Sequence, residues 1–120
     1  MEMVKIKFTK LYIRMLWQMI ERWILTDKVE KSNHKRLIEI MDRFVIAYDN
    51  NCKDSKHEYS LLFSYDNAVL LWEILKVTIE EGIVKDPQEM LIFSEAMTAI
   101  AIELERYNTM KVSPNELLLS

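Results

Sequence analysis

The chain has 120 residues, half of them hydrophobic, a formal net charge of −3, one Gly, two Pro and one Cys. This length fits a single domain over residues 1–120, and the hydrophobic content is too high for a disordered chain. The scarcity of Gly and Pro argues against all-β sandwiches and doubly wound sheets, which need more turns. The composition therefore predicts an all-α domain, a compact bundle of four main helices joined by few connections.

The composition also bears on the compartment. A lone Cys52 cannot form an internal disulfide, which suits a reducing cytosol. The N-terminus lacks the charged, apolar and small-residue regions of a signal peptide in that order. The most apolar stretch, residues 11–25, is interrupted by charged and polar side chains, so it does not make a membrane span. We expect a cytoplasmic protein that does not act at a membrane.

Residues 1–8 alternate apolar and basic side chains, a pattern typical of a strand. Residues 59–65 alternate in a similar way. Because two strands alone are marginally stable, we expect residues 1–8 to lead into the first helix. The alternative is a small hairpin made of the two segments.

The first helix is predicted over residues 9–26. One polar stripe runs along it, and the remaining apolar arc spans about 200°, where a surface helix needs only about 100°. Such a wide arc is covered either by neighbouring helices inside the domain or by a partner. Trp23 lies near the centre of the arc and is assigned to the core. The predicted protein interface consists of Ile13, Trp17, Ile20 and Ile24.

Two further helices are predicted over 33–48 and 56–81. The first is conventionally amphipathic. The second starts at a Ser-x-x-Glu capping box, Ser55 to Glu58, and a second start signal at Ser64 predicts a kink near 64–66. Gly82 stands where a C′ residue belongs, directly after this helix.

The clearest helix is predicted over residues 87–107. Asp86 is the expected N-cap, Pro87 the first helical residue, and Glu89 completes the start signal. Apolar residues occur on more than one side, which indicates burial on more than one side. We therefore expect 87–107 to be the central buried helix of the bundle, followed by a short C-terminal helix beginning near Ser113.

The search for catalytic motifs is negative. No Gly-rich loop is present, which excludes a P-loop and a dinucleotide fingerprint. One cysteine and two histidines cannot supply a four-ligand zinc site. Cys52 and His57 are close in sequence, but their polar surroundings suggest no activated nucleophile. The expectation is a protein that is not an enzyme and has no catalytic residue, cofactor or metal site.

Charge is unevenly distributed along the chain. Residues 1–36 contain nine Lys or Arg against four Asp or Glu, and the remainder is acidic. A basic surface of this kind can bind phosphates, but the preferred explanation is a basic first helix that lies against acidic neighbours. The candidate nucleic-acid contacts are Lys28, Lys31, Lys35 and Arg36.

Surplus apolar helix surface is the main functional hint. Eight Met and three Trp add adaptable and anchoring side chains of the kind found at interfaces. The sequence thus favours a non-enzymatic protein-binding or regulatory module that acts through apolar helix faces, with a protein partner or itself as a homodimer. The alternative is a small nucleic-acid-associated regulator that uses the basic N-terminal third.

Overall fold

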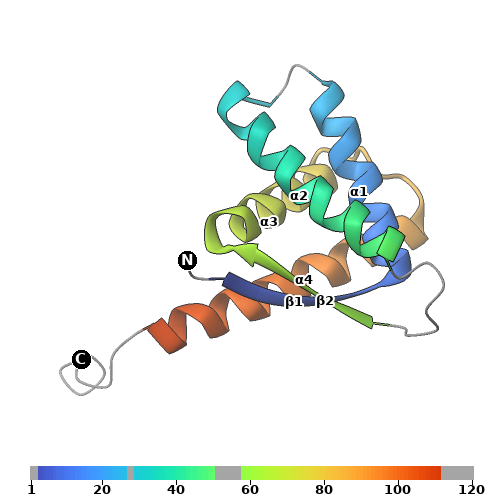
Figure 1. The fold of residues 1–120 in the computed structure, drawn as a ribbon. Coiled ribbons are helices and arrows are strands. Elements are labelled where there is room, and N and C mark those ends of the chain that lie inside the picture. Colours follow the sequence, from blue (N-terminus) through green and yellow to red (C-terminus); the bar gives the residue numbers. More distant parts are fainter. Residues whose placement is uncertain (1–2, 27–28, 51–57, 112–120) are drawn as a thin grey trace.

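The computed structural model describes residues 3–26, 29–50 and 58–111. In chain order these form β1 (Met3–Thr9), α1 (Lys10–Leu25), α2 (Lys31–Asn50), β2 (Glu58–Ser64), α3 (Tyr65–Glu80) and α4 (Pro87–Lys111). In Figure 1, α1 and α2 lie on one side of the strands, and α4 runs past them toward the C-terminal end of the chain.

The prediction of an all-α bundle is wrong. The described residues form a mixed α/β fold in which β1 and β2 pair as a two-stranded antiparallel sheet. Met3 lies opposite Ser64, and Thr9 lies opposite Glu58. The alternative pairing of the two alternating segments is the one that forms, although α1 and α2 separate the strands in the chain, so the pair is no hairpin.

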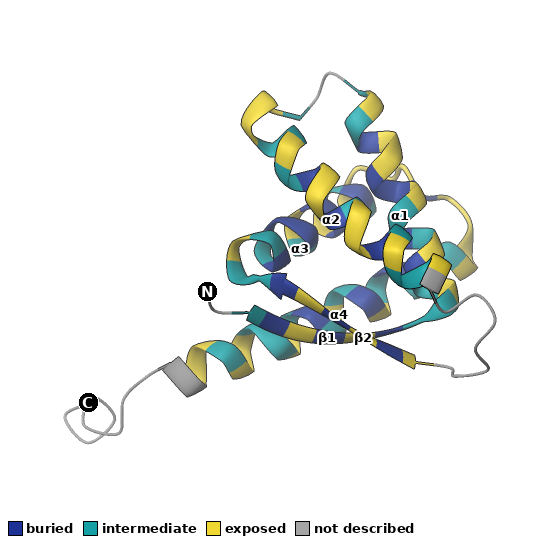
Figure 2. Cartoon of the chain, in the orientation of Figure 1, coloured by how far each residue is buried: buried dark blue, intermediate teal, exposed yellow. Residues whose placement is uncertain are grey.

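The sheet is stable because one of its faces is completely covered. The side chains on that face are all buried, and the side chains between them are mostly exposed (Figure 2). The buried set comprises Val4, Ile6, Phe8, Tyr59, Leu61 and Phe63. Two strands that are marginal in water become stable when they pack on helices. This burial is the reason that residues 3–8 do not extend the first helix.

Three phenylalanines fasten the sheet to α2. The ring centroid of Phe44 on α2 lies 5.5 Å from that of Phe8 and 5.5 Å from that of Phe63. The two strand residues are 6.5 Å apart, with their rings at 73°. Edge-to-face packing of this kind adds to the free energy gained by burying the rings.

The predicted helix over 56–81, with a kink near 64–66, is also wrong in its first part. Residues Glu58–Ser64 form β2, and the predicted kink near 64–66 is the junction between β2 and α3. Ser64 is the N-cap of α3, since its Oγ accepts a hydrogen bond of 3.2 Å from the backbone N–H of Asn67. Residues 55–57 of the predicted capping box lie outside the described residues.

The other helices begin and end close to where they were predicted. The predicted segments 9–26, 33–48 and 87–107 correspond to α1, α2 and α4. Thr9 caps α1 through its Oγ1, and the Asp86 carboxylate accepts from the backbone N–H of Gln88 at 3.0 Å. Gly82 has a positive φ of 66° just after α3, which confirms its predicted C′ role.

The most buried helix is α3, and the prediction that 87–107 forms the centre is wrong. Within α4, only Phe93, Ala96 and Ile100 are buried among the residues whose burial is described. The apolar residues on its other side, Leu91 and Ile102, are 59% and 50% exposed. On α3, by contrast, six residues are buried: Ala68, Leu70, Leu71, Ile74, Leu75 and Thr78.

Two remaining expectations concern the ends of the chain and the membrane. The predicted short C-terminal helix lies outside the described residues. Within residues 3–26, 29–50 and 58–111, no helix combines the length and the apolar character that crossing a bilayer requires.

Candidate docking surface

The four residues predicted as a protein interface face the interior of the protein. Ile13 and Ile20 are fully buried, and Ile24 is half-buried. Trp17 is also half-buried, and its ring packs edge-on against Tyr48 of α2 with centroids 5.8 Å apart. The wide apolar arc of α1 is therefore covered by the domain itself, and these side chains offer little surface to a partner.

The opposite side of α1 is open to solvent. Its residues recur every three or four positions, so they share one face of the helix. We call this set the α1 outer face: Leu11, Arg14, Met15, Gln18, Glu21, Arg22 and Leu25. Met15 is half-buried and the other six are exposed.

Two leucines stand at the ends of this face. Leu11 is 55% exposed and Leu25 is 79% exposed, the largest exposed fraction among the large hydrophobic side chains described. The predicted protein interface included neither of them. The missed signal is their spacing, since both share the helix face of Gln18, which lies seven residues from each.

Beside the α1 outer face lies a pocket of about 110 Å³, which we call the α1–α4 pocket. Its apolar walls come from α1, from the segment between α3 and α4, and from α4; they include Met15, Met19, Trp23, Ile83, Val84 and Phe93. The pocket has polar and charged residues among its lining as well, namely Gln18, Arg22, Thr26, Thr78 and Glu89.

Folding of the local chain explains why these walls meet. Gly82 ends α3 and turns the chain, and Pro87 starts α4 after a short connection. Ile83 and Val84 within this connection are thereby brought to the C-terminal half of α1. Val84 is buried, whereas Ile83 remains 46% exposed.

The buried polar groups in the pocket wall bond to one another or to the backbone. The indole N–H of Trp23 donates to Thr78 Oγ1 at 2.8 Å, and the Thr78 hydroxyl donates to the Ile74 carbonyl at 2.7 Å. Among the described residues, no buried side-chain nitrogen or oxygen lacks a partner. The wall thus offers a ligand mainly apolar contact, and polar contacts are available from the exposed side chains of Gln18 and Arg22.

The volume of the pocket indicates what it can hold. An apolar cavity of about 150 Å³ is large enough to take up benzene. The α1–α4 pocket is of the same order, which is room for one apolar side chain. An apolar hollow bordered by charged residues resembles the anchor pockets of protein interfaces.

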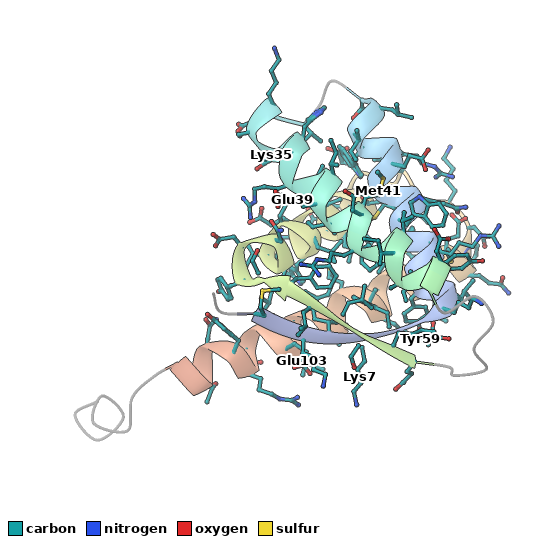
Figure 3. All side chains as sticks on the ribbon, viewed as in Figure 1. Lys7, Lys35, Glu39, Met41, Tyr59 and Glu103 are labelled. Atoms are coloured by element: carbon teal, nitrogen blue, oxygen red, sulfur yellow. The ribbon has the colours of Figure 1, made fainter. Side chains whose placement is uncertain are left out.

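The candidate nucleic-acid contacts do not form one free basic patch. Lys28 lies outside the described residues. Lys31 and Lys35 are exposed on the first turns of α2, where Figure 3 labels Lys35. Arg36 instead turns to α3, where its Nε donates to the Asn67 side-chain oxygen at 3.1 Å.

Arg36 also borders a larger hollow, of about 450 Å³, between α2 and the junction of β2 with α3. Charges of both signs line it, including Glu39, Asp42 and Arg43. The Asn67 amide bridges Arg36 and Glu39, since it also donates to the Glu39 carboxylate at 3.4 Å. With its charges mixed in this way, the hollow lacks the single sign of charge that would concentrate phosphate.

The candidate catalytic and metal-binding residues were compared with the part of the chain that the structure describes. No group of three or more His, Cys, Asp or Glu residues there is arranged to hold a metal ion. Cys52 and His57 lie outside the described residues. Comparisons with protein-family models, with curated proteins and with solved structures find no match to this chain.

Proposed function

We propose that the chain is a non-enzymatic protein-binding module that takes up an apolar side chain of a partner in the α1–α4 pocket. The observation that carries the proposal is the pocket itself. It is apolar, sized for one side chain, and adjoins a helix face that exposes Leu11 and Leu25. Burial of such an anchor in a desolvated pocket is the usual source of affinity in protein interfaces.

The surroundings of the pocket support this function. Gln18 and Arg22 on α1 and Glu89 on α4 supply hydrogen-bonding groups close to the apolar walls. Neither Arg22 nor Glu89 forms an ion pair within the described residues, so a partner can bind these two charges without breaking an existing pair. Apolar anchors surrounded by polar contacts give both affinity and orientation.

The nucleic-acid alternative has no comparable observation in its favour. Arg36 is engaged with Asn67, and the exposed Lys31 and Lys35 are close in sequence to Glu30 and Glu39. It stays a prediction, and a test of it is given in the Discussion.

A peptide selection with a matched pair of variants tests the proposed function. Peptides from a random display library are selected against the wild-type protein, and their dissociation constants are then measured. In Ile83→Glu a charge is placed in the pocket wall at a half-exposed position, so folding is retained while apolar anchors are repelled. We expect the selected peptides to contain a large apolar residue and to bind this variant at least about tenfold more weakly.

Ile46→Glu is the control. Ile46 is similarly exposed, at 57%, but it lies on α2 and lines the other hollow. Peptides that bind both variants as tightly as the wild type, or a selection that yields no binders, would contradict the proposal.

A further inference from the structure

The proposed function does not identify the partner. The residues of the α1 outer face indicate which partner fits. We infer that the partner is a second copy of this chain, docked with its α1 antiparallel to the first across a two-fold axis at Gln18. The inference rests on the proposed function, because Met15, Gln18 and Arg22 of the α1 outer face also line the pocket.

The face is self-complementary in its apolar residues. Leu11 and Leu25 each lie seven residues from Gln18, which is about 10.5 Å along the helix axis. When two such helices run antiparallel about Gln18, Leu11 of each copy comes to lie beside Leu25 of the other. A two-fold axis produces this contact twice, so both exposed leucines of each copy are covered.

The charges are complementary in the same arrangement. Arg14 and Glu21 are seven residues apart, almost two full turns, so they lie along the same edge of the face. When two antiparallel helices are related by a two-fold axis, the same edge of the face in each copy lies against its equivalent. Arg14 of one copy therefore lies beside Glu21 of the other, and this ion pair also forms twice.

The remaining residues of the face, Met15, Gln18 and Arg22, fit the same arrangement. Met15 lies on the other side of the face and comes to lie beside Arg22 of the second copy. A long arginine stem packs against a flexible methionine while its guanidinium stays in water. Gln18 meets Gln18 of the second copy on the axis, where each amide can donate to and accept from the other.

A parallel arrangement pairs the charges differently. With the two-fold axis along the helices, opposite edges of the face meet, so Glu21 of one copy would lie beside Arg22 of the other. Arg14 would then lie beside Met15 and form no ion pair. A loss of affinity on reversal of the Arg14 charge therefore distinguishes the antiparallel orientation from the parallel one.

Ion pairing inside one chain does not occupy these groups. Within the described residues, neither Arg14 nor Glu21 forms a salt bridge, and both side chains are exposed. The separation of about 10.5 Å along one helix is too long for a direct ion pair between them. A rescue of one charge reversal by the other can therefore be assigned to contacts between copies.

Other large apolar side chains are also exposed. They are Ile38 and Ile46 on α2, Leu62 on β2, Ile83 in the connection before α4, and Leu91 and Ile102 on α4. They define competing faces for self-association, and the charge reversals described next distinguish them from α1.

Sedimentation equilibrium over a wide concentration range tests the inference. The full chain is expected to dimerise reversibly. Arg14→Glu replaces two attractive contacts per dimer with two repulsive ones, so the dissociation constant should rise by about tenfold or more. Glu21→Arg should act in the same way. An equimolar mixture of these two variants should associate more tightly than either alone, because every cross-copy contact then joins opposite charges on one edge.

The double variant Arg14→Glu/Glu21→Arg provides the most specific test of this contact. Exchanging both charges re-creates opposite-charge contacts, so its dissociation constant should return to within about threefold of the wild-type value. The matched control is Arg43→Glu, at an exposed position on α2, which should leave the dissociation constant unchanged. Circular dichroism of each variant checks that the fold is retained.

Three results would overturn the inference. The first is a wild-type chain that stays monomeric at every concentration. The second is a dimer that neither single reversal weakens, which would place the contact on another face. The third is a double variant no tighter than the single ones. In each case, peptide binding sensitive to Ile83→Glu would still support the proposed function, so the two failures can be told apart.

Discussion

Trp23 and Thr78 join α1 to α3 by a buried hydrogen bond of 2.8 Å between the indole Nε1 and the threonine Oγ1. Thr78 is 2% exposed, and among the residues that the structure describes it is the one buried polar residue. Its hydroxyl also donates to the Ile74 carbonyl within α3. One hydroxyl thus allows a tryptophan to line the α1–α4 pocket without leaving its N–H unsatisfied.

Replacing Thr78 by Val keeps the shape of the side chain but removes this acceptor. The indole N–H of Trp23 is then buried without a partner, which should lower the free energy of unfolding by about 1–3 kcal/mol. Urea denaturation measures the change. Thr78→Ser is the control, because it keeps the hydroxyl and loses only a methyl group, at a cost of about 0.8 kcal/mol. A Val variant as stable as the wild type would show that the bond contributes nothing.

Gly82 ends α3 with a φ of +66°, and a Cβ added there would meet no atom within 4 Å. Because the space is open, the cost of a side chain at this position is purely conformational. Gly82→Ala should therefore lower the free energy of unfolding by about 1–2 kcal/mol, the cost of the left-handed region for an L-residue. Gly82→Asn should cost less, since Asn tolerates this region.

The neighbouring exposed Glu81 provides the control for Gly82. Its φ of −79° is ordinary for any residue, so Glu81→Ala should change stability by no more than about 0.5 kcal/mol. An alanine at 82 that is tolerated as well as one at 81 would contradict the conformational explanation. Thermal denaturation of both variants provides the comparison.

Phe44 links both strands to α2, so its loss should affect the whole sheet. Phe44→Ala should lower the free energy of unfolding by about 3–5 kcal/mol, because it leaves a cavity between Phe8 and Phe63. Ile46→Ala on the same helix is the control, and it should cost little because Ile46 is exposed. Equal effects of the two substitutions in denaturant titrations would argue against this cluster as the main contact between sheet and helix.

The same contacts explain what the sequence could and could not predict about the fold. Local signals were reliable at helix ends. Ser64 and Asp86 accept hydrogen bonds from backbone N–H groups two or three residues further along the chain, and Gly82 adopts a positive φ by itself. The strand pair was predicted only as an alternative because its stability comes from Phe44, which is distant from both strands in sequence. Alternation alone could not show that a helix would cover one face of so small a sheet.

The burial of the four predicted interface residues has a related cause. Periodicity showed correctly that α1 has too much apolar surface for a single neighbour, but it could not show how many neighbours α1 has. Tyr48 of α2 covers Trp17, and Ile13 and Ile20 are fully buried. The pocket was not foreseeable either, because Trp23, Ile83 and Phe93 meet only through the turn at Gly82.

The last prediction concerns the nucleic-acid alternative. We expect Lys31→Glu/Lys35→Glu to change binding of a labelled DNA duplex by less than about twofold at physiological salt, where phosphate contacts dominate affinity. The reason is that Arg36 is drawn to Asn67 and cannot reinforce the two exposed lysines. Fluorescence anisotropy at several salt concentrations measures both the affinity and its salt dependence.

Lys85→Glu is the matched control for this experiment, since Lys85 is exposed in the connection before α4. It makes the same charge change as each lysine substitution on α2. If DNA binds only by non-specific attraction to positive charge, the loss of affinity per reversed lysine should be similar at Lys85 and on α2. Wild-type binding that falls steeply with salt and is lost only on reversal of Lys31 and Lys35 would instead locate a phosphate site on α2. That outcome would favour the nucleic-acid function over docking at α1.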